Sequence, residues 1–218
     1  MDTINPNKPL LLTASAPEAE TIIEGIAHLH AHCILHDHTL ATFLPPLSFA
    51  KMTSYWSDRL SQVSTGHRHI IVQLLPISTR TANTPPSVFT ADSETSASAP
   101  EIDIGGEKFE VAGVVSLHKP ESETGPFRGE VEKLFTSPNH RRKGVARTIM
   151  RELEMVAVRD DRWSLLLDTT VGTEAENVYP RLGYTRMGVV KAYGISPEDG
   201  QLVDEVWFWK DLRSSEPI

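Results

Sequence analysis

The loop Arg141–Ala146 carries residue types whose spacing suits the binding of a phosphate or pyrophosphate group. It follows a strand-like run at 129–136 and precedes a helix-like run at 145–158. The first N–H groups of a helix have no partner within the helix, and the helix dipole adds a partial positive charge at that end. Gly144 would let the backbone approach a ligand without a Cβ in the way.

Basic side chains and the start of the helix complete this predicted site. The cations are Arg141, Arg142 and Lys143, which would place mobile positive charge beside a bound phosphate. The helix start contributes Val145, Ala146 and Arg147. The alternative is a basic loop that does no more than cap an ordinary helix, since short motifs also occur without a ligand.

The segments after the loop favour the binding site. A strand-like run at 163–168 and a helix-like run at 174–182 follow, and the latter leads into Leu182-Gly183-Tyr184. Residues 141–146 resemble the Arg/Gln-x-x-Gly-x-Gly/Ala pyrophosphate loop of the GNAT superfamily, the acetyl-CoA-dependent N-acetyltransferases. Residues 175–184 resemble the second signature of that superfamily, in which a Tyr precedes Leu-Gly-Tyr/Phe.

Within the superfamily, the chain is most similar to the bacterial tabtoxin-resistance acetyltransferases. The shared features are the Glu-Val-x-Lys-Leu run at 130–134, Leu-Asp-Thr at 167–169 and Asp-Gly-x-Leu at 199–202. The resemblance covers residues 128–212, whereas residues 1–127 match only in general layout. It implies an acceptor that is a small amine, such as a metabolite, an amino-acid-like toxin or an antibiotic.

Composition limits the function classes. The chain has 218 residues, 39% of them hydrophobic, and a net charge of −8 with a pI near 5.6. This charge argues against a protein that grips nucleic acid by its overall charge, and it is compatible with a cationic amine substrate. The single cysteine, Cys33, suits a reducing compartment, and no segment reads as a signal peptide or a membrane span. We expect a cytoplasmic monomer or homodimer.

The length predicts one domain over 1–218, and the resemblance implies an acetyltransferase domain of α/β (α+β) class. Helices are expected from Ala16-Pro17-Glu18 onward, with Ile22, Ile26, Leu29 and Cys33 on one apolar stripe, and at 48–63, 145–158 and 174–182. Strands are expected at 9–13, 69–75, 109–118, 129–136, 163–168, 184–190 and 203–210. Residues 77–105 are polar and small, and we expect a mobile insertion there.

The resemblance implies a GNAT fold: a mixed, twisted sheet of about seven strands with helices on both faces. Its two central strands would splay into a V-shaped slot, between the strands that end near Phe135 and Asp168. The pantetheine arm of acetyl-CoA would lie in the slot and pair with the backbone of Leu134, Phe135 and Thr136. A backbone N–H near Phe135 would stabilise the oxyanion.

Acetyl transfer to an amine requires removal of a proton from the ammonium and a proton donor for the leaving thiolate. The resemblance assigns Glu130 and Asp168 to the first task, as bases through water or as anchors for the amine. Glu132 projects from the same strand face as Glu130, but the tabtoxin-resistance group has Gln there, so its assignment to the substrate is the weaker one. The alternative is that these acids form ion pairs on the sheet.

Tyr179 is the predicted general acid, because a phenol is protonated at neutral pH and can donate to the sulfur of CoA. The superfamily commonly places a donor Tyr at this position, and Asn177 would contact the pantetheine. The alternative is a core tyrosine on an amphipathic helix. Tyr193, in a segment expected to cover the substrate, could stack on an ammonium group, or it is an ordinary surface or core aromatic.

Five histidines crowd the segment 28–38, and His28, His32 and His36 would share one helix face. Such spacing can bind zinc, but no Glu or Cys completes a recognised pattern, and no metal is expected. We expect this helix end, with His36, to form a wall of the acceptor pocket; solvated histidines are the alternative.

Acetyl-CoA as co-substrate, direct attack in a ternary complex and a small primary amine as acceptor are the resulting predictions. The alternatives are acetylation of a protein lysine or N-terminus, a non-catalytic acyl-CoA-binding module, and a histidine-dependent metal-binding protein on the same fold.

Overall fold

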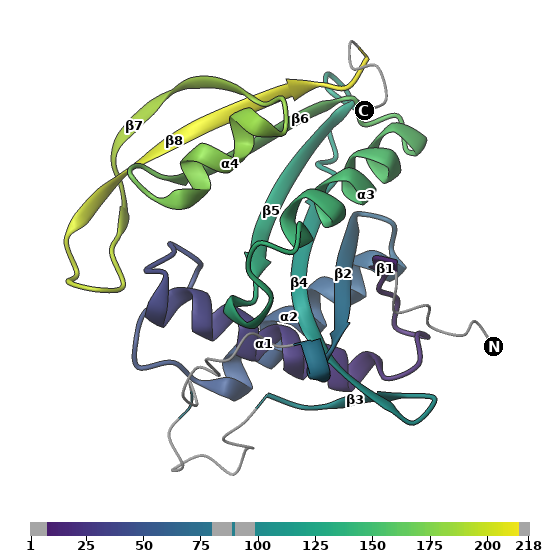
Figure 1. Ribbon diagram of the computed structural model, residues 1–218. Coiled ribbons are helices and arrows are strands. Elements are labelled where there is room, and N and C mark those ends of the chain that lie inside the picture. The colour runs from purple at the N-terminus through teal and green to yellow at the C-terminus, as the bar shows by residue number, and fades with distance from the viewer. Residues whose placement is uncertain (1–7, 80–88, 90–98, 214–218) are drawn as a thin grey trace.

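A mixed sheet forms the centre of the computed structural model, which describes residues 8–79, 89 and 99–213. Its strands are ordered β1-β2-β4-β5-β6-β8-β7, and β3 pairs with β4 (Figure 1). The strands are β1 Leu10–Leu11, β2 Arg68–Pro76, β3 Ile102–Ile104, β4 Glu107–His118, β5 Arg128–Thr136, β6 Ser164–Thr170, β7 Thr185–Ile195 and β8 Leu202–Asp211. The helices are α1 Ala19–His36, α2 Phe49–Ser64, α3 Val145–Arg159 and α4 Glu174–Arg181, with short 3-10 turns at Ile77–Thr79 and Pro138–His140.

The described sheet has one strand more than the seven expected. The extra strand is β3, which lies inside the predicted insertion 77–105 and pairs with β4 through Ile102↔Phe109. Gly105 and Gly106 both have positive φ and form the hairpin turn. Ile102 is fully buried, which explains why an apolar residue occurs in this polar segment. An apolar residue close to a Gly-Gly turn is a sequence signal for a strand. Most of residues 77–101 lie outside the described part, and their mobility stays a prediction.

Helices cover both faces of the sheet, as predicted. On one face α1 and α2 pack on β2 and β4, and the predicted stripe Ile22, Ile26, Leu29 and Cys33 is buried. On the other face α3 packs on β2, β4 and β5, and α4 packs on β6 and β7 (Figure 1). In β8, Val206 and Phe208 are buried in this second core, whereas Trp207 and Trp209 point the other way and are half-buried. Of the helices in the described ranges, none is both long and apolar enough to cross a membrane.

Three histidines of α1 belong to the core, which corrects the alternative of a solvated segment, whereas the pocket wall with His36 stays a prediction. His28, His30 and His32 are all buried. His30 donates from Nε2 to the carbonyl of Ala41 at 2.8 Å and accepts at Nδ1 from the indole of Trp56 at 3.2 Å. Its ring also stacks on Phe135 of β5, with the centroids 4.7 Å apart.

The sheet divides between β5 and β6. These parallel strands share only three register pairs, from Arg128↔Ser164 to Glu130↔Leu166. Beyond this point β6 continues along β8 and β5 along β4, and the two strands diverge (Figure 1). The resulting splay confirms the expected fold.

A bulge at Lys133 modifies β5 within the splay. The register advances two residues along β4, from Ser116 to Val114, and three along β5, from Glu132 to Phe135. Lys133 has φ +57, the positive value that lets one residue bulge out of the ladder. The bulge therefore moves odd-numbered side chains of β5 from one face of the sheet to the other. Val131, before the bulge, packs under α3 and α4, whereas Phe135, after it, packs under α1.

Candidate active site

The predicted phosphate loop lies at the start of α3 and is exposed. Gly144 is the N-cap with φ +75, and a Cβ added there would meet nothing within 4 Å. The left-handed backbone explains the glycine, and its lack of a side chain leaves the first N–H groups of the helix uncapped. Val145 packs against Gly113 of β4, where an added Cβ would lie 2.5 Å from Val145 Cγ1. Close contact with the strand thus fixes where α3 begins.

Two of the three predicted cations have partners within the protein. Arg141 donates to Asp37, just past the end of α1, at 2.6 Å. Lys143 donates to the carbonyl of Thr79 and lies 3.3 Å from Nδ1 of His140. Arg142 is exposed and has φ +61. These contacts tie the loop to the end of α1 and to the turn at Ile77–Thr79. In the first turn of α3, Ala146 is half-buried and Arg147 is exposed.

The segment Leu134–Thr136 lies beyond the point where β5 leaves β6. Leu134 packs on the core under α3, and Phe135 is buried under α1. Because the side chains point into the two cores, the backbone is the part of the strand that lines the divergence. The predicted backbone contacts with pantetheine stay a prediction.

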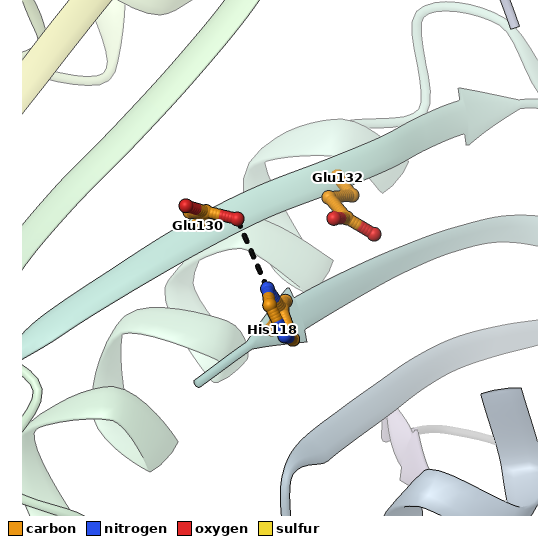
Figure 2. A group of neighbouring side chains, drawn as sticks. All are labelled: His118, Glu130 and Glu132. Carbon is orange, nitrogen blue, oxygen red and sulfur yellow. Dashed lines mark hydrogen bonds and ion pairs between the residues drawn. The ribbon is translucent and has the colours of Figure 1, made fainter. Parts of the chain in front are cut away.

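Glu130 and Glu132 lie on the same face of β5, as predicted, and each has a side-chain partner. Glu130 Oε2 is 3.0 Å from Nδ1 of His118 on β4 (Figure 2). Glu132 Oε2 is 2.6 Å from Arg68, which is buried at the start of β2. Arg68 also donates to Ser116 at 2.6 Å and to Gln62 at 2.8 Å. For Glu132, the ion-pair alternative therefore describes the arrangement.

His118, Glu130 and Glu132 each offer one potential ligand atom, and these atoms lie within 4.8 Å of one another. Donors of this kind can bind a divalent cation. However, the guanidinium of Arg68 already supplies a positive charge to Glu132. The arrangement fits acid–base chemistry at Glu130 better than a metal centre.

Asp168 is exposed on β6 and interacts with a carboxyl group that the sequence did not single out. Burial, a hydrogen bond with Asp168 and the charge of Asp168 together raise the pKa of Glu205 to about 8, while the charge of Lys133 opposes this shift. Glu205 is buried on β8, opposite Thr170 of β6. The pair therefore holds a proton at neutral pH. Burial also lowers the pKa of Lys133, which the nearby Glu132 partly offsets.

Tyr179 on α4 is buried, with a relative exposure of 6%. Its ring packs on Phe208 and Tyr184, with centroids 5.4 and 6.0 Å away. Burial raises the pKa of the Tyr179 phenol, and the charge of Asp168 raises it further. The phenol therefore remains protonated at neutral pH, as a proton donor must. Asn177 lies two residues earlier on α4 and is exposed.

The remaining predicted residues lie at the surface. His36 is exposed at the end of α1, with its ring 4.3 Å from that of His32. Tyr193 is 54% exposed and its ring meets Trp207 edge-on at 6.1 Å. It lies within β7, which extends to Ile195, rather than after a strand that ends at residue 190.

The connection between α1 and α2 meets the hairpin of β7 and β8. Leu40 Cδ1 lies 2.4 Å from where a Cβ on Gly194 would be, so the glycine admits this contact. Nε2 of His38 and Oε1 of Glu198 lie 3.7 Å apart in the same region. The two segments therefore connect the halves of the sheet on the far side of the splay.

Comparison with known proteins agrees with this arrangement. Residues 77–184 match the acetyltransferase (GNAT) family. The match includes the divergent strands, the glycine-capped start of α3 and α4 with Tyr179. The chain belongs to this family and is an acetyltransferase.

Solved structures share the fold at low identity. An N-acetyltransferase from Staphylococcus aureus Mu50 has 13% identity and a TM-score of 0.61, covering 94% of this chain and 99% of that one. A candidate acetyltransferase from Salmonella typhimurium with its cofactor acetyl-CoA has 14% identity and a TM-score of 0.60, covering 97% of each. A ribosomal L7/L12 α-N-protein acetyltransferase in complex with coenzyme A has 13% identity and a TM-score of 0.63, covering 95% and 96%.

Proposed function

We propose that this protein transfers the acetyl group of acetyl-CoA to a primary amine of a small molecule, by direct attack in a ternary complex. One observation carries the proposal: β5 and β6 diverge after Glu130 and Leu166, beside a helix start that Gly144 leaves uncapped. The backbone of 141–147 would hold the pyrophosphate. The edge of β5 at 134–136 would pair with the pantetheine, and Asn177 would contact it from α4.

The chemistry divides between the two halves of the sheet. Acetyl-CoA supplies a thioester carbonyl that an amine can attack. Glu130 or Asp168, or an ordered water beside either, would take the proton of the ammonium group, and a backbone N–H near Phe135 would stabilise the oxyanion. Tyr179, whose phenol burial keeps protonated, would donate a proton to the departing sulfur.

A small cationic acceptor is supported by charge and by access. The acids Glu130 and Asp168 lie on the two strands that diverge, where they would attract an ammonium group. The contact of Leu40 with Gly194 joins the two halves of the sheet at one side, which leaves less room for an extended peptide. The resemblance to the tabtoxin-resistance group favours an acceptor with amino-acid character.

The second candidate is acetylation of a protein N-terminus. It is favoured by the structural likeness to a ribosomal L7/L12 α-N-protein acetyltransferase, whose name states such a substrate. The two differ in which acceptor leads to release of free CoA.

The test is a thiol-release assay with acetyl-CoA and two acceptor panels, one of small amines and amino acids and one of peptides with free N-termini. We expect turnover with members of the first panel and loss of turnover in Tyr179→Phe. Tyr184→Phe is the matched control, because Tyr184 is a buried tyrosine whose ring adjoins that of Tyr179. Turnover with peptides alone would establish the second candidate, and acetyl-CoA binding without turnover on either panel would contradict both.

A further inference from the structure

His118 and Glu130 form a pair that two adjacent strands hold in register. They are direct partners in the antiparallel ladder of β4 and β5, and Nδ1 of His118 lies 3.0 Å from Glu130 Oε2 (Figure 2). An ionised carboxylate can only accept a hydrogen bond, so a neutral His118 must carry its proton on Nδ1 to make this contact. Its Nε2 is then the unprotonated nitrogen, the atom that can take up a proton.

The surroundings distinguish Glu130 from Glu132. Arg68 is held by Gln62 and Ser116 and neutralises Glu132 at 2.6 Å. Glu130 is instead bonded to the imidazole of His118, and its side chain is 48% exposed. His118 also lines an open recess of about 440 Å³, together with Gln62, Lys119 and Glu121. Water in that recess can reach the ring.

We propose that His118 and Glu130 act as a dyad that removes the proton from the acceptor amine, an inference that rests on the proposed acetyltransferase function. The ammonium proton passes, directly or through one water, to Nε2 of His118. The nitrogen lone pair then forms the N–C bond to the thioester carbonyl, the C–S bond breaks, and the sulfur takes its proton from Tyr179. The second proton of the former ammonium group leaves the new amide nitrogen and passes through water to the Tyr179 phenolate, which restores the phenol. Glu130 stabilises the imidazolium, which releases the proton to water in the recess.

General acid–base chemistry gives the reason for a dyad. As chemical groups, imidazole is about 2 pKa units more basic than a carboxylate, and an alkylammonium is far less acidic than either conjugate acid. An imidazole therefore takes the amine proton against a smaller difference in acidity than a carboxylate alone. The carboxylate of Glu130 fixes the ring and its tautomer, as acids paired with catalytic histidines do.

The kinetic test compares His118→Asn with His118→Ala in the thiol-release assay. The Asn amide can donate to Glu130 from nearly the position of Nδ1, but it cannot take up a proton. If the dyad operates, both variants lose about 100-fold in kcat with little change in the KM for acetyl-CoA. Added imidazole should then restore part of the activity of His118→Ala. Wild-type activity in His118→Asn would overturn the proposal, because His118 would then only position Glu130.

His67→Ala is the matched control, since His67 lines the same recess and bonds Glu121 at 2.6 Å. We expect it to keep the wild-type rate. A loss equal to that of His118→Asn would show a general effect of emptying the recess and would contradict the dyad.

A second measurement does not depend on acetyl transfer. Long-range ¹H–¹⁵N NMR spectra of ¹⁵N-labelled protein near pH 8.5, with His118→Asn to assign the resonance, report the tautomer of His118. The dyad requires the Nδ1–H form in the wild type and its loss in Glu130→Ala, which removes the acceptor of the Nδ1 proton. An Nε2–H form in the wild type would overturn the dyad. An Nδ1–H form in a protein that acetylates none of the amines would refute the proposed function instead.

Discussion

Acidification is predicted to destabilise this protein because three histidines of α1 are buried in its core. His30 is the clearest case, since its exposure is 0% and both ring nitrogens are bonded within the protein. Burial is the main cause that lowers its pKa from 6.5 to about 3, with the charges of Lys133 and Arg59 acting in the same direction. Burial likewise lowers the pKa of His28 and of His32 to about 4.

The direction in which stability changes with pH follows from how many protons the folded and unfolded states bind. Between about pH 6.5 and 3, the unfolded chain binds a proton at each of these histidines and the folded protein does not, so stability falls as pH falls. The stability that the neutral, buried histidines contribute is complete above their pKa in the unfolded chain and is lost on acidification. Between pH 7 and 5 the free energy of unfolding falls by about 2 kcal/mol through His30, and His28 and His32 lower it further in the same direction. A loss of this size is a large fraction of the stability of many domains.

Urea unfolding at pH 7, 6 and 5 measures this loss in the wild type and in His30→Gln. The Gln amide can still donate to the carbonyl of Ala41 but cannot be protonated, so the variant should lose about 2 kcal/mol less between pH 7 and 5. His38→Gln, at an exposed histidine beyond the helix, is the control. Equal pH dependence in the wild type and His30→Gln would refute the reasoning, whatever the absolute stabilities.

Two further substitutions test the packing and charge arguments. Arg68→Met leaves Glu132 half-buried without its cation and removes the donor to Ser116. The free energy of unfolding, measured with urea or heat, should therefore fall by about 3 kcal/mol. An unchanged unfolding midpoint would mean that the ion pair contributes nothing to stability. Gly113→Ala forces a Cβ against Val145. The variant should lose about 1–3 kcal/mol of stability and should also bind acetyl-CoA more weakly. A loss of stability with unaltered binding would contradict the idea that this contact sets the start of α3.

Periodicity was sufficient for most of the fold. The stripe of α1 and the alternation of β8 follow from burial on one side of an element, and both are visible in the sequence. The strand β3 was missed because its three residues are too few to show a period. The buried histidines of α1 were wrongly predicted because a residue type does not reveal its partners. At His30, for example, both ring nitrogens are bonded, to Ala41 and to Trp56.

The candidate site divides in the same way. The loop around Gly144 was predictable because the positive φ and the helix start are local properties of the chain. Glu205, His118 and Arg68 were missed because their importance comes from neighbours on other strands. Strand order and register decide those contacts, and a single sequence does not encode them in any local pattern.

Calorimetric titration with acetyl-CoA tests the central claim most directly, with Gly144→Asp compared against Gly200→Asp. The two glycines have nearly equal positive φ, +75 and +73, and an added Cβ meets nothing within 4 Å at either, so the backbone strain is matched. Only Gly144→Asp brings a carboxylate to the start of α3. We predict micromolar binding by the wild type and Gly200→Asp, and its loss in Gly144→Asp. Absence of binding by the wild type, or equal binding by both variants, would contradict the account.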